Sequence, residues 1–168
     1  MNKRSIVRTL GQVSTAACIV MLLGNQLAYA HKPPGHEAKI VGVWDVRVNI
    51  TNCNPNGTPG NVIFASFNAM NVFEADGTFL DTNSQNPVTT SSHFGYWRHI
   101  RGNKYEFAQK FFLFDTAGMS VGWRIVRHDV ELTKSGLSFA SFGTSETYDN
   151  DGILIGTGCS TSTAIRFR

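Results

Sequence analysis

Residues 41–52 read VGVWDVRVNITN, and apolar and polar side chains alternate along this stretch. One face of the extended segment is apolar, with Trp44, Val46, Val48 and Ile50, and the other is polar, with Asp45, Arg47, Asn49 and Thr51. A period of two residues is typical of a half-buried β-strand, because successive side chains of a strand point to opposite sides. The stretch therefore predicts a strand.

Similar runs fill the rest of the chain. Each run is bounded by turn-forming residues, and the runs cover residues 62–74, 78–82, 93–100, 104–114, 119–132, 137–148 and 153–167. Asp76-Gly77, between the second and third runs, is a strong hairpin signal. Short connections make successive strands antiparallel neighbours, so we predict an all-β fold, a single up-and-down eight-stranded antiparallel barrel. A two-sheet sandwich is the alternative.

The N-terminal segment has the pattern of a secretory signal peptide. Basic residues (Lys3, Arg4, Arg8) precede an apolar stretch at residues 16–23, which is followed by Ala28-Tyr29-Ala30. We therefore expect a signal peptide at residues 1–30, a flexible leader at 31–39 and the barrel domain at 40–168. The expected product is secreted or periplasmic and has no membrane anchor.

Two cysteines, Cys53 and Cys159, follow the predicted cleavage point. In an oxidising compartment a disulfide between them is the default expectation. Cys53 ends the first run and Cys159 lies midway along the last. Because the first and last strands of a closed barrel pair with each other, such a bridge would hold the seam and favours the barrel over an open sheet.

The charge balance limits the classes of partner. The chain has 15 Lys and Arg residues and 12 Asp and Glu residues. Three of the basic residues and none of the acidic ones lie in residues 1–30, which leaves 12 of each sign afterwards. A neutral chain without a basic run argues against nucleic-acid binding. We also find no motif for a metal ion or a cofactor, and we expect neither.

Polar residues within apolar faces are the candidate ligand-binding residues. Gln109 shares a face with aromatic residues of its run, and Arg98 and Tyr96 share a face with Phe94 and Ile100. In residues 119–132 the apolar positions change from odd to even. This change predicts a β-bulge near Val126 that brings either Arg124 or His128 into the interior. The structural alternatives are a satisfied core amide at Gln109, an Arg98 at the barrel rim and a structural or exposed histidine.

Gly42-Val43-Trp44, at the start of the first predicted strand, resembles the Gly-x-Trp opening of lipocalins and their calycin relatives. The resemblance implies an eight-stranded barrel that holds a small apolar ligand. It also implies a basic residue near the end of the barrel that packs on Trp44, and Arg166 or Arg168 fits that position.

Three functions are compatible with this sequence. The first is a barrel that binds or carries a small, mainly apolar molecule in its cavity. The second is an enzyme of the cyclase or isomerase type that acts on an apolar substrate in the same cavity, as allene oxide cyclase-like barrels do. The third is an interaction module with a solidly packed interior, since 12 Phe, three Trp and four Tyr residues supply enough bulk.

Overall fold

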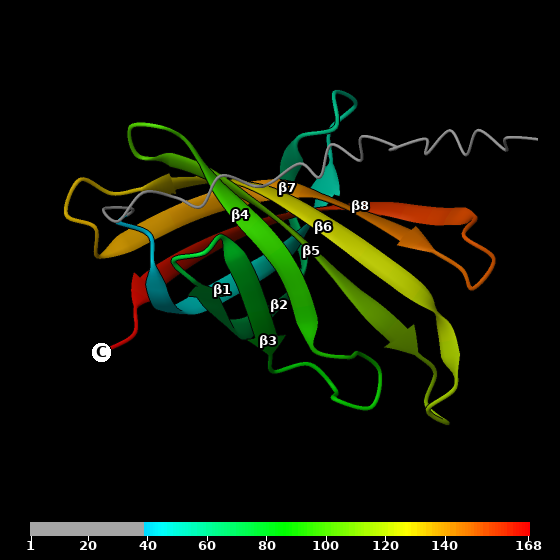
Figure 1. The fold of residues 1–168 in the computed structure, drawn as a ribbon. Coiled ribbons are helices and arrows are strands. Elements are labelled where there is room, and N and C mark those ends of the chain that lie inside the picture. The colour runs from blue at the N-terminus through cyan, green and yellow to red at the C-terminus, as the bar shows by residue number, and fades with distance from the viewer. Residues whose placement is uncertain (1–38) are drawn as a thin grey trace, which may run out of the picture. The chain divides into compact units, whose positions relative to one another are not determined.

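The computed structural model describes residues 39–168, which form eight β-strands and no helix (Figure 1). The strands are β1 (Gly42–Cys53), β2 (Pro59–Phe73), β3 (Thr78–Asn83), β4 (His93–Arg101), β5 (Lys104–Phe114), β6 (Ser120–Leu132), β7 (Ser138–Tyr148) and β8 (Leu154–Arg166). The all-β prediction is confirmed, and every strand end lies within three residues of its predicted position. The predicted signal peptide, residues 1–30, and residues 31–38 of the predicted leader lie outside the described residues.

The strands form one closed ring. Each strand pairs antiparallel with its neighbour in sequence, and β1 pairs with β8. The β1–β8 seam runs from the pair Trp44 and Arg166 to the pair Thr51 and Cys159. The up-and-down order follows from the short connections, such as the turn in which Gly77 has a φ of 94°, a conformation that favours glycine. The barrel prediction is therefore confirmed over the sandwich.

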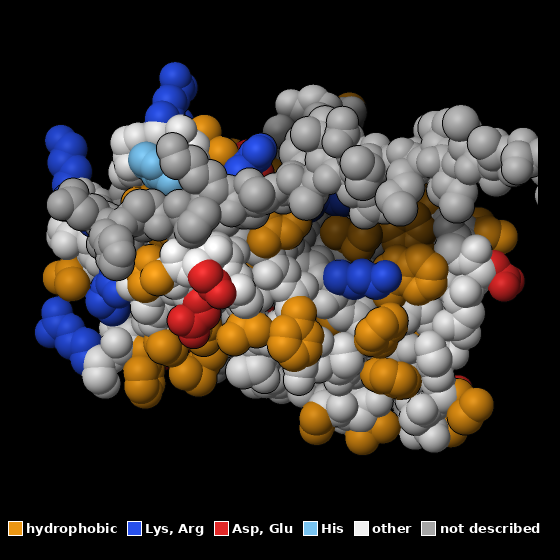
Figure 2. Space-filling view, viewed as in Figure 1, with side chains coloured by type: hydrophobic (Ala, Val, Ile, Leu, Met, Phe, Trp, Pro, Cys, Tyr) orange, Lys and Arg blue, Asp and Glu red, His pale blue; other side chains and the backbone are white. Residues whose placement is uncertain are grey.

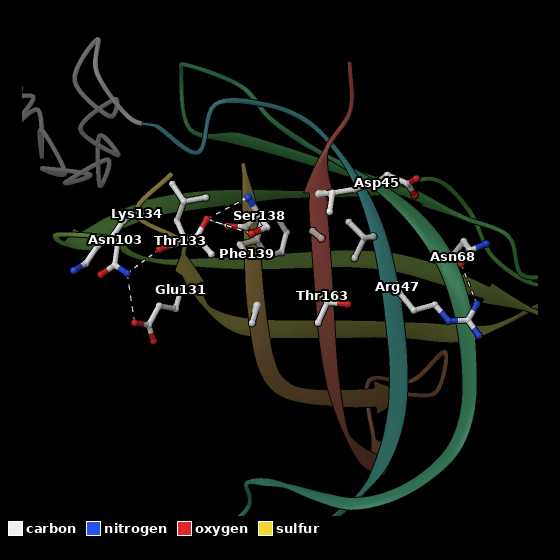
Figure 3. A pocket seen from close by; sticks show the side chains of 15 residues that line it. Asp45, Arg47, Asn68, Asn103, Glu131, Thr133, Lys134, Ser138, Phe139 and Thr163 are labelled. Carbon is white, nitrogen blue, oxygen red and sulfur yellow. Dashed lines mark hydrogen bonds between the residues drawn. The ribbon is translucent and has the colours of Figure 1, made fainter. Parts of the chain in front are cut away.

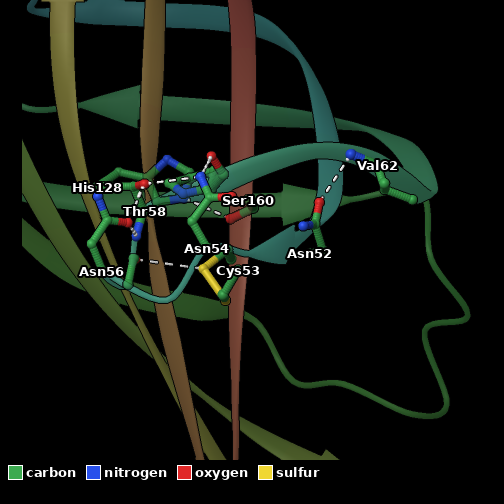
Figure 4. The surroundings of a disulfide bond; sticks show 11 residues. Asn52, Cys53, Asn54, Asn56, Thr58, Val62, His128 and Ser160 are labelled. Atoms are coloured by element: carbon green, nitrogen blue, oxygen red, sulfur yellow. Dashed lines mark hydrogen bonds between the residues drawn. A yellow bond between two sulfur atoms is a disulfide. The ribbon is translucent and has the colours of Figure 1, made fainter.

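The predicted disulfide joins Cys53 to Cys159 at the seam (Figure 4). Cys53 ends β1, while Cys159 lies directly opposite Thr51 on β8. Beyond the disulfide, Asn52 Oδ1 accepts a hydrogen bond of 2.9 Å from the Val62 amide. Because Pro59 pairs with Cys53, β2 begins at Pro59 and not at Val62 as predicted.

Side chains that point into the ring divide its interior in two. At the end where β1 begins and β8 finishes, buried hydrophobic residues pack into a group that we call the aromatic plug: Ile40, Trp44, Val46, Ala69, Phe73, Phe79, Trp97, Tyr105, Phe107, Val130, Leu132, Phe139 and Ala164. Phe73 lies at its centre, with edge-to-face contacts to Phe79 at 4.9 Å and Trp97 at 6.0 Å between ring centroids. Aromatic bulk thus fills this end.

Buried polar atoms of the plug are satisfied by backbone carbonyls. Trp44 Nε1 donates to the Ile40 carbonyl at 2.8 Å, and Trp97 Nε1 donates to the Glu74 carbonyl at 2.8 Å. Arg166 donates to the carbonyls of Val41 and Gly136 at 2.8 and 3.2 Å. Each group that would be costly to bury unpaired therefore has an acceptor.

The predicted β-bulge near Val126 is absent. β6 pairs with β5 without interruption from Glu131 to Gly122, and the register shifts only between Leu113 and Phe114 of β5. The odd-numbered apolar residues of β6 lie outside the ring. Trp123 is stabilised there by stacking on Tyr148 at 5.7 Å and by Lys110 Nζ at 4.4 Å from its ring centroid. The prediction was wrong because outward aromatic residues cover one another.

Hydrophobic side chains are common on the face of the molecule shown in Figure 2. Phe94 of β4 and Phe112 of β5 point outward and are 62% and 51% exposed. Within residues 39–168 there is no helix of the length and hydrophobicity that crossing a bilayer would take.

Candidate functional site

The half of the ring away from the aromatic plug contains a cavity of about 440 Å³. Every strand contributes to its wall, and the apolar part consists of Val46, Val48, Ile50, Phe67, Phe107, Phe111, Val126 and Ile155. Volumes of this size are typical of small-molecule sites, in which a mainly apolar wall carries a few polar groups. Polar side chains line the rest of this wall, and three groups of them stand out by their burial or by polar atoms without a partner.

The first polar group is centred on His128 of β6. His128 Nδ1 and Nε2 each lie 2.8 Å from a serine hydroxyl, of Ser141 on β7 and Ser160 on β8. Ser141 Oγ lies 2.6 Å from Ser162 Oγ, which extends the chain of hydrogen bonds along the wall. All four side chains are buried. Burial lowers the pKa of His128 from 6.5 to about 4, so the imidazole is neutral at neutral pH.

Gly143 makes room for this histidine. It lies directly opposite His128 in the β6–β7 pairing. A Cβ atom at residue 143 would clash with the Arg127 carbonyl and would lie 2.5 Å from His128 Cδ2. On the other side the His128 ring stacks on Phe107, with 5.2 Å between centroids. The ring is therefore held tightly in one orientation.

The second polar group is an acid–histidine pair. His93 Nδ1 of β4 lies 2.5 Å from Asp81 Oδ2 of β3, and both side chains are buried. The His93 ring stacks on Phe111 at 3.8 Å. Burial raises the pKa of the Asp81 carboxyl above its ordinary value, although the hydrogen bond to His93 acts in the opposite direction. The pair is fixed in position and adjoins the cavity.

The third polar group comprises Arg124 of β6 and Gln109 of β5. Arg124 Nε donates to Thr147 Oγ1 at 2.9 Å, and burial lowers the pKa of the guanidinium from its ordinary value. No carboxylate pairs with Arg124 within the described part of the chain. Gln109 is 9% exposed, and its Oε1 atom has no hydrogen-bond partner there. Both Arg124 and Gln109 therefore carry polar atoms that have no partner among the described residues.

Of the five residues predicted as ligand-binding, the structure places Gln109, Arg124 and His128 on the wall of the cavity. Both Arg124 and His128 point inward, because the bulge that would have separated them is absent. Tyr96 and Arg98 instead lie on the outer face of β4, where Arg98 forms an ion pair with Glu106. Arg98 was expected either inside the barrel or at its rim, and its side chain is 57% exposed.

Sequence reasoning missed Asp81 and His93. A usable signal was present, because Asp81 follows Phe79 at a spacing of two residues and His93 precedes Trp97 at a spacing of four. Residues at even spacing along a strand share a face, so these polar residues had to point the same way as the large aromatic ones. The interpretation gave more weight to Phe94 and Tyr96, which are exposed.

A second hollow, of about 880 Å³, lies over the outward faces of β1, β8, β7 and β6 (Figure 3). Several of its polar groups are paired with neighbouring side chains. Arg47 donates to Asn68 at 2.9 Å, and Asn103 donates to Glu131 at 3.4 Å. This hollow is open to solvent and holds no unpaired buried polar atom, so the cavity inside the barrel is the better candidate site.

No protein-family model matches the chain, and no curated protein matches it. Residues 39–168 contain no group of three or more His, Cys, Asp or Glu side chains arranged to hold a metal ion. Inference about function therefore depends on the geometry of the cavity.

Proposed function

We propose that the protein binds or carries a small, mainly apolar molecule in the cavity of its barrel. The observation that carries this proposal is the division of the interior. Aromatic residues gather in the plug at one end, and the other end holds a cavity of about 440 Å³. An interaction module with a solidly packed interior does not have this division. The apolar wall would bury the body of a ligand, and the polar groups would orient it.

Two features support a lipocalin-like carrier that is exported. Trp44 of Gly42-Val43-Trp44 lies in the plug, and Arg166 at the end of β8 packs on it, as the resemblance implies. The Cys53–Cys159 disulfide fits an oxidising compartment, either outside the cell or in the periplasm. The predicted signal peptide at residues 1–30 belongs to the same proposal.

Binding is tested with the neutral fluorophore N-phenyl-1-naphthylamine, whose emission rises on transfer to an apolar site. We expect saturable one-to-one binding to the purified protein. Val126→Trp, which fills the cavity, should abolish this binding. Ile125→Trp places the same side chain on the outer face of β6 and should leave it unchanged. Equal binding by the two variants would place the probe outside the barrel and contradict the proposal.

Because a bulky substitution inside the barrel can unfold it, each variant is first compared with the unsubstituted protein by circular dichroism and thermal unfolding. Native mass spectrometry of protein from its own source supplies an independent measurement. A retained small molecule is the expected result. An empty protein that also fails to bind the fluorophore would end the proposal.

The Asp81–His93 pair favours a second candidate function, an enzyme of the cyclase or isomerase type. A histidine oriented by a buried carboxylate is suited to move a proton to or from a substrate. In the test, the protein is incubated in deuterated water with the small molecule that it retains. The measurement is the exchange of carbon-bound hydrogen of that molecule for deuterium. Enzymatic exchange that is lost in Asp81→Asn and in His93→Gln would support catalysis, whereas binding without exchange would support a carrier.

A further inference from the structure

Arg124 differs in its partners from Arg98 and Arg127, the two arginines of the described strands that form ion pairs. On the outside of the ring, Arg127 pairs with Glu146 at 2.7 Å and Arg98 pairs with Glu106. Arg124 is half-buried inside the ring, and its only hydrogen bond within the described residues runs from Nε to a neutral hydroxyl. Its terminal nitrogens have no acceptor there. A cation that burial has partly desolvated is costly to leave without an anion.

The inner carboxylate of Asp81 does not supply this anion. Asp81 lies on β3 and is engaged by His93 of the adjacent strand, whereas Arg124 lies on β6. The described interior therefore holds a cation that faces the cavity and is not neutralised by the protein itself.

Gln109 supplies a second and independent observation on the same part of the wall. In the β5–β6 pairing Gln109 lies opposite Val126, and Arg124 lies opposite Phe111. Arg124 and Gln109 are therefore diagonal neighbours on one face, at a separation of about 7–8 Å. The buried Gln109 Oε1 atom lacks a donor. Apolar side chains of Phe111 and Val126 complete this part of the wall.

We infer that the ligand of this cavity is an amphipathic anion, an apolar molecule whose carboxylate or similar acidic group pairs with Arg124. A hydroxyl or N–H group of the same ligand donates to Gln109 Oε1. Arg124 then gains the counterion that its surroundings lack, and Gln109 gains its missing donor. This inference depends on the proposed binding function and specifies its ligand class.

Two fluorophores with the same apolar skeleton separate the contribution of the anionic group to binding from that of the apolar body. 8-Anilino-1-naphthalenesulfonate carries an anionic group, N-phenyl-1-naphthylamine lacks it, and both carry one N–H donor. We expect the unsubstituted protein to bind the anionic probe about tenfold or more tightly than the neutral probe, in line with the coupling between close charged groups. Arg124→Gln should reduce the two affinities to within about twofold of each other and leave the neutral probe unaffected.

The variants have matched controls. Arg124→Lys keeps the charge and should retain most of the preference for the anionic probe. Arg127→Gln removes a cation from the outer face of the same strand and should change neither affinity. Gln109→Met should weaken the neutral probe, whose N–H group is free to donate to Gln109 Oε1, and should weaken the anionic probe less, because its own adjacent sulfonate accepts from the same N–H group. Val126→Trp should abolish binding of both probes and so excludes binding at the exposed hydrophobic surface.

A measurement on the unsubstituted protein keeps the inference falsifiable if Arg124→Gln does not fold. Dodecanoate should displace the neutral probe at a concentration about tenfold lower than dodecan-1-ol does. Equal displacement, or an anionic preference that persists in a folded Arg124→Gln variant, would overturn the inference and leave the carrier function standing. Failure of both fluorophores to bind would instead overturn the proposed function itself.

Discussion

The guanidinium of Arg166 lies over the indole ring of Trp44, 4.3 Å from its centroid. The two residues are directly paired across the β1–β8 seam. Cation–π attraction and the hydrogen bonds of Arg166 to backbone carbonyls act together at this point. One side chain thus covers the aromatic plug and links the last strand to the residues that precede the first.

Replacing Arg166 with Ala should lower the free energy of unfolding by about 3 kcal/mol, because it removes the cation–π contact and leaves carbonyl groups unpaired. Arg166→Lys should recover only part of this loss, since an ammonium group cannot reach several carbonyls in a planar fork. Guanidinium-induced unfolding measures both effects. Arg47→Ala, on the outer face of β1, is the control and should cost less than about 1 kcal/mol. Equal losses at Arg166 and Arg47 would contradict the role of Arg166.

Removing the disulfide should destabilise the protein by about 4 kcal/mol, because Cys53 and Cys159 are separated by 106 residues and close a long loop. The double variant Cys53→Ala, Cys159→Ala tests this by denaturant unfolding. A reductant should destabilise the unsubstituted protein to the same extent and should have no effect on the double variant. Any effect on the double variant would show that the reductant acts elsewhere.

Stability should depend on pH through His128. In the unfolded chain this residue titrates near 6.5, whereas burial in the fold lowers its pKa to about 4. The folded state therefore binds a proton less readily. The contribution of the neutral imidazole is complete above about pH 6.5 and is lost as the pH falls toward about 4, by up to about 3 kcal/mol.

The variant His128→Gln isolates this contribution, because all other titrating groups are common to both proteins. The difference in unfolding free energy between the unsubstituted protein and the variant should shrink by about 3 kcal/mol between about pH 7.5 and pH 4. Unfolding in guanidinium at several pH values measures it. A difference that stays constant with pH would show that His128 does not titrate as described.

Gln109→Met should stabilise the empty protein by about 1 kcal/mol, because it removes a buried acceptor that has no donor. Gln85→Met is the matched control, since Gln85 also lines the cavity but is exposed. Thermal unfolding without ligand measures both. Destabilisation by Gln109→Met would indicate that the amide is satisfied in solution, and it would weaken the argument that it awaits a ligand.

The strands could be predicted because their ends are marked by local chemistry. Turn residues such as Asp76 and Gly77 bound the runs, and period-two alternation in β1 identifies its buried face directly. The disulfide and the closed ring followed from the same reasoning, since Cys53 and Cys159 lie on the two strands that meet at the seam.

The faces of β4 and β6 could not be assigned in this way. Phe94, Tyr96 and Trp123 are outward, so hydrophobicity alone does not distinguish inside from outside. Burial of Asp81 and His93 depends on their pairing with each other, which requires the alignment of two strands. The even spacing from Phe79 and Trp97 indicated the direction of these two side chains, but their pairing with each other left no local pattern in the sequence. The candidate site was therefore predicted only in part.

The disulfide and the Trp44–Arg166 contact lie at opposite ends of the same seam. Because β1 and β8 are held together at both ends of their pairing, they cannot separate progressively from either end. The aromatic plug fills the end of the ring at Trp44, and the cavity, whose lining includes Cys159, lies in the half toward the disulfide. On the proposed function, a ligand would therefore enter and leave at the unplugged end while the β1–β8 seam stays closed.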